Sequence, residues 1–190
     1  PDQNSIAIEA GAYNFGRLSL QGGSEMAGHR IGAAFVGANS GGYRDASGYG
    51  QQKLSLSHLA DLSGWAVRSH FTATLLNQET GGYVRGENAY EDANLRTSNP
   101  NPEAYRDAWS LRLNSELSRD AWTLKPYLRR SQMAFLQHFL PGQPLEENDQ
   151  SSVGLIVERD ISSAATQLSV GGQVELMSGG LREFQAKPTT

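Results

Sequence analysis

The chain has 190 residues, with 16 Lys or Arg against 20 Asp or Glu, so its formal net charge at pH 7 is −4. This balance provides no electrostatic footprint for nucleic acid, and the absence of cysteine excludes disulfides and thiol chemistry. The length suits one all-β domain, and the 21 glycines suit a chain of strands and turns. No apolar run approaches the roughly 18 residues that a membrane-spanning helix needs.

Alternation of apolar and polar residues predicts four strands in the first sixty residues. Ile6 and Ile8 are two residues apart in the first of these segments, and Leu54 and Leu56 are two apart in the fourth. This spacing places such side chains on one face of a sheet. The predicted strands are 5–12, 17–21, 29–38 and 51–59, with a turn expected at residues 22–24.

The clearest alternation lies in residues 65–75 and 109–117. One face of each segment is apolar and begins with a tryptophan, Trp65 or Trp109, whereas the other face carries charged residues such as Arg68 and Arg112. Lipid on one side, water on the other and aromatic residues at the interface are typical of a transmembrane β-barrel. These two segments predict that the sheet spans a membrane.

Three further strands are expected after residue 117, at 121–131, 152–159 and 166–176. Pro126 is awkward within the first of them, because proline removes a ladder donor and is normally confined to sheet edges, strand starts or bulges. Residues 179–190 show no reliable alternation. The sequence therefore predicts nine strands.

The connectors between these strands alternate in length. Long connectors are expected at 39–50, 78–107 and 132–150, and short ones at 22–28, 60–64, 118–120 and 160–165; the turn near Tyr13 and Gly16 is short where a long one would be expected. Outer-membrane barrels have this one-sided asymmetry, and soluble sandwiches have shorter strands. The expected fold is an all-β, antiparallel, up-and-down transmembrane β-barrel segment. An odd count of about nine strands suggests part of a larger barrel, since bacterial barrels close with even numbers.

Four stretches carry a resemblance to a known family: IAIEAGAYNF at 6–15, GYRDASG at 42–48, NPNPEAYRD at 99–107 and FLQHFLPGQPLEEN at 135–148. With them the chain resembles the first part of the β-barrel of TonB-dependent outer-membrane receptors. The first stretch resembles the barrel strand that directly follows the plug domain of these receptors. The resemblance extends over nearly the whole chain.

The resemblance implies a barrel of roughly 22 strands with a plugged lumen, in the bacterial outer membrane. It implies active uptake of a ferric siderophore or a similarly scarce ligand, with energy transmitted by TonB. The implied partners are outer-membrane lipid, the ligand, and the TonB complex through a plug region that this sequence lacks. Residues 1–190 would then be a partial barrel domain, without the plug and the C-terminal strands, and less than half of a receptor.

No motif in the sequence points to catalysis, a cofactor or a metal. The four histidines, His29, His58, His70 and His138, have no HExxH or Cys/His spacing. No GxSxG-like nucleophile motif occurs, and the glycine pairs lack the spacing of phosphate-binding loops. We therefore expect a protein that is not an enzyme.

The long connectors hold the candidate ligand-binding residues. Aromatic faces and arginine suit flat, anionic or catecholate chelates, through stacking and charge-assisted hydrogen bonds. Connector 78–107 also carries six acidic against three basic residues, so it is not a general anion trap. The alternative is that these side chains only pack the loops against one another. The candidates are Tyr83, Arg85, Tyr90, Arg96, Phe135, His138 and Phe139.

Two other functions remain open. A passive outer-membrane porin would use the same wall and leave its lumen open. A soluble carbohydrate-binding β-sandwich would place Trp65, Trp109 and Trp122 in its core or on its binding face.

Overall fold

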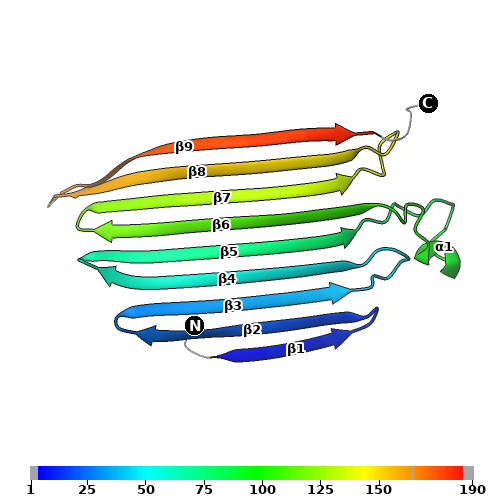
Figure 1. Ribbon diagram of the computed structural model, residues 1–190, viewed down its shortest axis with the longest axis horizontal. Coiled ribbons are helices and arrows are strands. Elements are labelled where there is room, and N and C mark those ends of the chain that lie inside the picture. The colour runs from blue at the N-terminus through cyan, green and yellow to red at the C-terminus, as the bar shows by residue number, and fades with distance from the viewer. Residues whose placement is uncertain (1–3, 164, 186–190) are drawn as a thin grey trace.

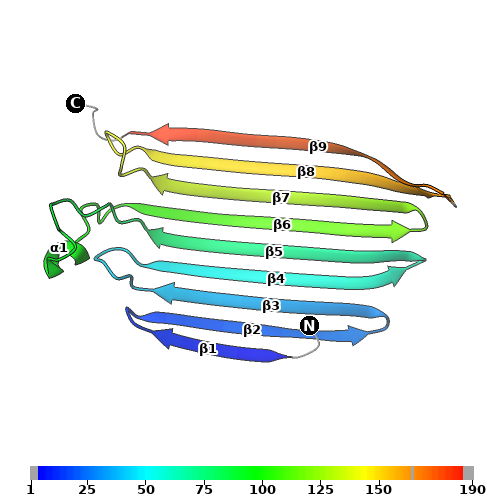
Figure 2. The same ribbon diagram turned by 180° about the vertical axis from the view of Figure 1, so that it is seen from behind.

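The computed structural model describes residues 4–163 and 165–185, which form one open antiparallel sheet (Figures 1 and 2). The nine strands lie side by side in chain order, and β1 and β9 form its two edges. The predicted all-β, up-and-down antiparallel fold is therefore confirmed. The strands are β1 (Ser5–Gly11), β2 (Phe15–Met26), β3 (His29–Ser40), β4 (Tyr49–Leu62), β5 (Trp65–Glu79), β6 (Tyr105–Arg119), β7 (Trp122–Leu136), β8 (Leu145–Ser162) and β9 (Gln167–Phe184).

Two-residue turns set the strand ends at one end of the sheet. Ala27 and Gly28 have φ of 52° and 79°, and Ser63 and Gly64 have φ of 55° and 81°. Turns with positive φ at both central residues match the right-handed twist of the strands that they join. The turn expected at residues 22–24 is therefore wrong: these residues lie within β2, and the chain reverses only at Ala27.

The remaining corrections also lengthen the strands. The long connectors shrink to residues 41–48, 80–104 and 137–144, and β8 begins at Leu145 within the predicted loop. β9 continues to Phe184, although its alternation was expected to end at residue 176. Residues 186–190 of the expected irregular tail lie outside the described residues. The strands continue beyond their alternating segments because hydrogen bonds between neighbouring strands need only backbone N–H and C=O groups.

Pro126 lies inside β7 and causes no bulge. Asn114 pairs with Tyr127 and Leu117 with Leu124, so the β6–β7 register is the same on both sides of the proline. The ladder lacks only the bridges opposite Lys125 and Pro126. On the other side Pro126 pairs with Leu155 of β8. The missing N–H of proline thus removes pairing with β6 at this point, and no extra residue is inserted in either strand.

Alternate residues of each strand build two different faces. One face, which we call the apolar face, carries a single row of apolar residues from β5 to β9: Phe71, Leu113, Leu128, Val153 and Leu176. The adjacent row belongs to the other face, the polar face, and reads Thr72, Arg112, Arg129 and Ser152 across β5 to β8.

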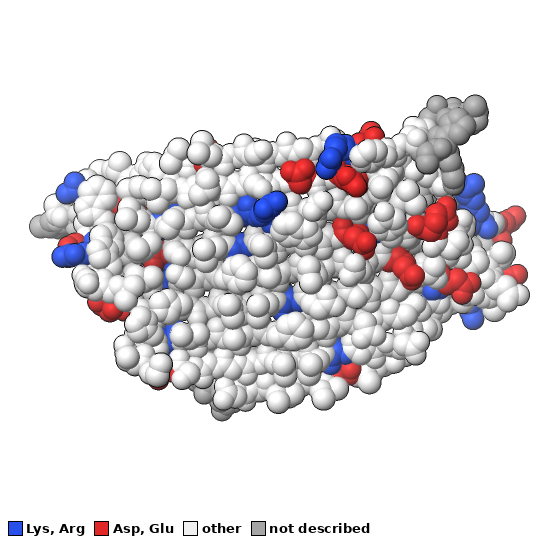
Figure 3. Space-filling model, viewed as in Figure 1, with Lys and Arg blue, Asp and Glu red and all other residues white. Residues whose placement is uncertain are grey.

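The large side chains of the apolar face point outward and form no core. Leu113 is 42% exposed and Leu176 is 71% exposed, and the buried hydrophobic residues in the described part of the chain are only Ala89, Ala104 and Tyr127. Figure 3 shows this face: charged side chains are sparse over its middle, and acidic ones gather toward the end where α1 lies in Figure 1. The sheet therefore presents an apolar band bounded by polar ends.

Tryptophans mark both ends of the apolar band. Trp65 and Trp122 begin β5 and β7 at the end with the two-residue turns, and the guanidinium of Arg159 lies 5.0 Å from the centre of the Trp122 ring. Trp109 lies near the opposite end, where its Nε1 donates to Oε1 of Gln132 at 3.1 Å. Trp109 and Trp122 thus each have a polar contact beside an apolar face, as is usual for interfacial tryptophans.

Candidate functional site

The long connectors all lie at one end of the sheet, together with helix α1 (Ala93–Thr97) (Figure 1). They follow β3, β5 and β7, and the connector after β5, residues 80–104, is the longest. The short connector after β1, residues 12–14, lies at the same end. The turns after β2, β4, β6 and β8 lie at the opposite end. The predicted length asymmetry is confirmed, including the short exception after β1.

Arg44 ties connector 80–104 to connector 41–48. Its Nε and Nη2 donate to the carbonyl oxygen of Ser98 at 2.9 and 2.7 Å, and its Nη1 donates to the carbonyl of Gly82. Backbone N–H of Asp45 donates to the carbonyl of Thr97 at 2.8 Å. One guanidinium therefore holds residues near both ends of connector 80–104 against connector 41–48.

α1 is short, and the side chain of Asp92 caps its N-terminus. The Asp92 carboxylate accepts hydrogen bonds from the N–H groups of Asn94 and Leu95 at 2.8 and 3.1 Å, as an N-cap does. None of the five residues of α1 is buried. The helix therefore packs no side chain into a core.

The predicted ligand residues of connector 80–104 are exposed and only partly brought together. The guanidinium of Arg85 lies 5.2 Å from the centre of the Tyr83 ring. Tyr83 and Tyr90 are both 69% exposed. Arg96 occupies the last turn of α1. These residues present aromatic and cationic surface to solvent, and no ring contact joins Tyr90 to Tyr83 in the described part of the chain.

The predicted residues around connector 137–144 form a cluster with Arg106. The ring centres of Phe135 and Phe139 are 5.9 Å apart, and the His138 ring meets Phe139 edge-on at 5.6 Å. The guanidinium of Arg106, from β6, lies 4.7 Å from the centre of the Phe135 ring. Phe135 itself belongs to β7, so its expected place in a loop is wrong. We refer to Arg106, Phe135, His138 and Phe139 as the aromatic–arginine cluster.

Several polar atoms in and beside this cluster are buried without a protein partner. They are Nε of Arg106, Nδ1 of His138 and Oε1 of Gln137, which is itself only 7% exposed. Buried polar groups are normally hydrogen-bonded, so such atoms mark a place for water or for a ligand. The cluster therefore combines apolar rings with unused hydrogen-bonding capacity.

Sequence reasoning overlooked Arg44 and Gln137 and did not select Arg106 as a site residue. Arg44 acts on carbonyl groups about 40 to 55 residues away in the chain, and no local pattern signals such a contact. Gln137 is one of several polar residues in its stretch. Arg106 had one usable signal, since strand pairing places it beside Phe135.

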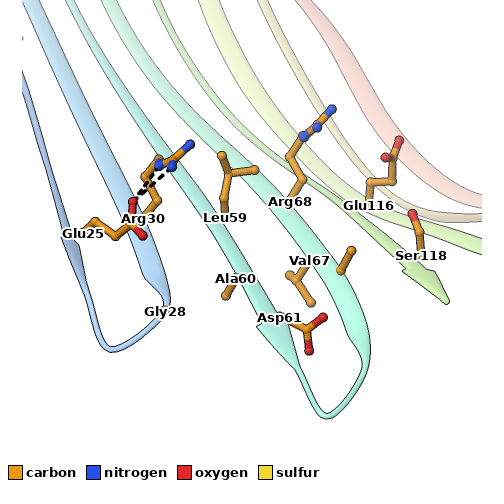
Figure 4. A pocket seen from close by; sticks show the side chains of 11 residues that line it. Glu25, Gly28, Arg30, Leu59, Ala60, Asp61, Val67, Arg68, Glu116 and Ser118 are labelled. Atoms are coloured by element: carbon orange, nitrogen blue, oxygen red, sulfur yellow. Dashed lines mark hydrogen bonds and ion pairs between the residues drawn. The ribbon is translucent and has the colours of Figure 1, made fainter. Parts of the chain in front are cut away.

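A hollow lies on the polar face at the end away from the long connectors, near the two-residue turns (Figure 4). It has a volume of about 420 Å³. Its floor is one row across five strands, in which Leu59 separates the Glu25–Arg30 ion pair, at 3.0 Å, from Arg68 and Glu116. This hollow is open and charged, and contains none of the predicted ligand residues.

Within the described ranges, no group of three or more His, Cys, Asp or Glu side chains is placed to hold a metal ion. The same residues include no helix long and apolar enough to cross a membrane.

Comparison with known proteins adds a likeness of fold. No protein-family model and no curated protein matches the sequence. Among solved structures, the chain is similar to P. aeruginosa FpvA, a TonB-dependent receptor, in its complex with iron and a heterologous pyoverdine, with a TM-score of 0.65 and 10% sequence identity. The match covers 96% of this chain and 28% of that receptor. The chain thus shares the fold of a stretch of that protein and spans just over a quarter of its length.

Proposed function

We propose that residues 1–190 are part of the wall of an outer-membrane β-barrel receptor that takes up a ferric siderophore, or a scarce ligand of similar chemistry, with energy from TonB. In this proposal the apolar face contacts lipid and the polar face lines the lumen. The long connectors face the cell exterior and the two-residue turns face the periplasm. A plug domain in the lumen would provide the contact with the TonB complex.

The observation that carries the proposal is the size of the apolar band. Trp109 and Arg119 lie ten residues apart on β6, at opposite ends of the band. Ten residues of strand span roughly 33 Å, and a tilt of about 40° reduces this to about 25 Å across the membrane. An apolar band about 25 Å tall, flanked by aromatic residues, is what an outer-membrane barrel presents to lipid. The likeness of fold to a siderophore receptor supports the same reading.

The outer end supports ligand capture. The aromatic–arginine cluster offers ring faces, a cation and unpartnered donors in one place. Flat anionic chelates are bound by such groups through stacking and charge-assisted hydrogen bonds. The role of Tyr83, Arg85, Tyr90, Arg96, Phe135, His138 and Phe139 in binding is part of the proposal.

The two alternative functions differ from the proposal in different features. A soluble β-sandwich buries one face of each of its sheets against the other, whereas the described residues form one sheet whose large apolar side chains are exposed. A passive porin would have the same wall and an open lumen. Dependence of uptake on TonB separates the receptor from the porin.

Two single cysteines test the topology in intact cells, and this chain has no cysteine of its own. Asn88 lies in connector 80–104 and Asp120 in the turn after β6, at opposite ends of the sheet. In the full-length protein, a membrane-impermeant maleimide should label Asn88→Cys and leave Asp120→Cys unlabelled until the outer membrane is opened. The reverse pattern would invert the proposed topology, and recovery of the protein in the soluble fraction would refute the membrane assignment.

A matched uptake experiment tests the activity. Cells that express the protein should accumulate the ferric ligand, and deletion of TonB should abolish accumulation while binding to the cells persists. Uptake that continues without TonB would favour the passive porin.

A further inference from the structure

Two arginines face each other at mid-height on the polar face. Arg112 of β6 is directly paired with Arg129 of β7, and both side chains are exposed. Like charges directly opposite each other on neighbouring strands destabilise a sheet. None of the ion pairs formed by the described residues includes either arginine. The pair therefore carries two adjacent positive charges that the surrounding wall does not neutralise.

The acidic residues of this face lie in other rows. Glu175 of β9 is two strands across and two residues along from Arg129, which places their backbones roughly 12 Å apart. Glu9 pairs with Arg17 at 3.6 Å, and Glu158 with Lys125 at 2.6 Å. Glu116 lies opposite Arg68 and four residues along β6 from Arg112. That distance along a strand is roughly 13 Å, which exceeds the screening length of about 8 Å at physiological ionic strength. Within the described part of this wall, Arg112 and Arg129 therefore have no ion-pair partner.

Residues with hydroxyl groups flank the two arginines in the strand register. In the same row, Thr72 is paired with Arg112 and Ser152 with Arg129. In the next row of this face, toward the long connectors, Ser110 is paired with Ser131. These four side chains carry hydrogen-bond donors and no charge. The arginines thus lie in a neutral, donor-rich part of the wall.

A packed aromatic ring holds one of the two arginines in place. Tyr127 is 6% exposed, and its hydroxyl accepts a hydrogen bond from Nε2 of Gln173 at 2.8 Å. The ring lies over Gly154, where a Cβ would overlap it. The guanidinium of Arg129 stacks on this fixed ring, 4.5 Å from its centre. A platform of this kind reduces the side-chain entropy that Arg129 would lose on binding a ligand.

We propose that Arg112 and Arg129, with the hydroxyl groups beside them, form a binding site for a small oxyanion, a phosphate or carboxylate group, on the polar face. Paired guanidinium groups bind such planar or tetrahedral anions through parallel charge-assisted hydrogen bonds, and arginines on a lumen wall select anions. The site goes beyond the proposed uptake function: it requires only that the polar face is wet, whichever solute the barrel transports.

Titration of the purified full-length protein in detergent with inorganic phosphate, at constant ionic strength, tests this site. Isothermal titration calorimetry should show saturable binding to the unsubstituted protein. Arg112→Gln and Arg129→Gln should each weaken it about ten-fold, about 1.4 kcal/mol, because each removes one of two charged partners. Lys53→Gln is the control, since it removes one positive charge from the same face two strands away from Arg112. It should leave the affinity unchanged.

Thermal unfolding of the same variants separates binding from a structural role. Without phosphate and at low salt, Arg112→Gln should be at least as stable as the unsubstituted protein, because like-charge repulsion is relieved. With phosphate it should lose the gain in melting temperature that ligand binding provides. Absence of phosphate binding to the unsubstituted protein, equal weakening by Lys53→Gln, or a variant that is less stable in both buffers would each overturn the proposal. None of these outcomes depends on siderophore uptake, so the two proposals fail separately.

Discussion

The two faces of this sheet are made from alternate residues of the same strands, yet they are organised on different principles. The apolar face repeats apolar side chains in the row from β5 to β9, and its polar contacts, such as those of Trp109 and Trp122, lie toward the ends of the band. The polar face depends on particular contacts, such as Tyr127 over Gly154 and Lys125 with Glu158. Lipid imposes only a requirement for apolar surface, whereas a wet wall gains stability and selectivity from individual polar contacts. Residue parity therefore decides the first face, and three-dimensional placement decides the second.

The largest expected difference comes from placing the same charge on each face. Leu113 lies near the middle of the apolar band, so Leu113→Arg should cost about 2–4 kcal/mol of folding free energy in lipid. Asn114→Arg, one residue along β6 on the polar face, should cost far less because the side chain stays in water. Folding into lipid vesicles, followed by urea titration, measures both. Equal destabilisation by the two changes would contradict the assignment of the faces.

A second pair of substitutions tests the packed ring on the polar face. Gly154→Ala should cost about 1–3 kcal/mol, because the new Cβ overlaps the ring of Tyr127. Gly172→Ala is the control, since a Cβ there meets nothing within 4 Å. That change should be neutral or stabilising by up to about 1 kcal/mol, through the lower entropy of the unfolded chain. Thermal unfolding in detergent distinguishes the two, and similar melting temperatures would show that Tyr127 moves away without cost.

The loop end tests whether specific contacts extend to ligand capture. Changing Tyr83, Tyr90, Phe135 and Phe139 together to Ala should weaken ligand binding by ten-fold or more, about 1.4 kcal/mol, through lost stacking. Barrel assembly should survive, because three of these residues lie in connectors and Phe135 lies near the end of β7.

The matched control for this prediction is the Tyr13–Tyr43 pair, whose ring centres are 5.4 Å apart at the same end of the sheet. Changing both to Ala removes aromatic surface outside the proposed site and should leave the affinity unchanged. The measurement is the affinity of each full-length variant for the ferric ligand. An unaffected quadruple variant would leave these residues as packing alone.

The smallest expected effect concerns Arg44. Arg44→Lys should speed hydrogen exchange in residues 94–99 by up to about ten-fold, since a single ammonium cannot reproduce the fork to Ser98 and Gly82. Arg85→Lys is the comparison, because the guanidinium of Arg85 has a ring contact with Tyr83 and carries no such bridge in the described ranges. The melting temperature of the sheet should not change in either variant. Equal exchange rates would show that α1 is held by other contacts.

Sequence alternation predicted the number of strands, their order along the chain and the faces of β5 and β6. It succeeded at Leu111 and Leu113 because a strand places alternate side chains on opposite faces, whatever its neighbours are. It failed at strand ends such as Gly22 to Ser24 and Glu146 to Gln150. Those residues show no alternation and are ordered by backbone pairing with the next strand.

The candidate site divides in the same way. The sequence by itself determined that aromatic and cationic residues are concentrated in the long connectors, since composition and spacing are local properties of the chain. Only the tertiary structure decided that Arg106 lies against Phe135, that Arg44 joins connector 41–48 to connector 80–104, and that Arg112 faces Arg129. Each of these contacts joins residues from different strands or loops. Strand register, set by the hairpin turns and by backbone hydrogen bonds between strands, brings such residues together, and no pattern within one segment encodes it.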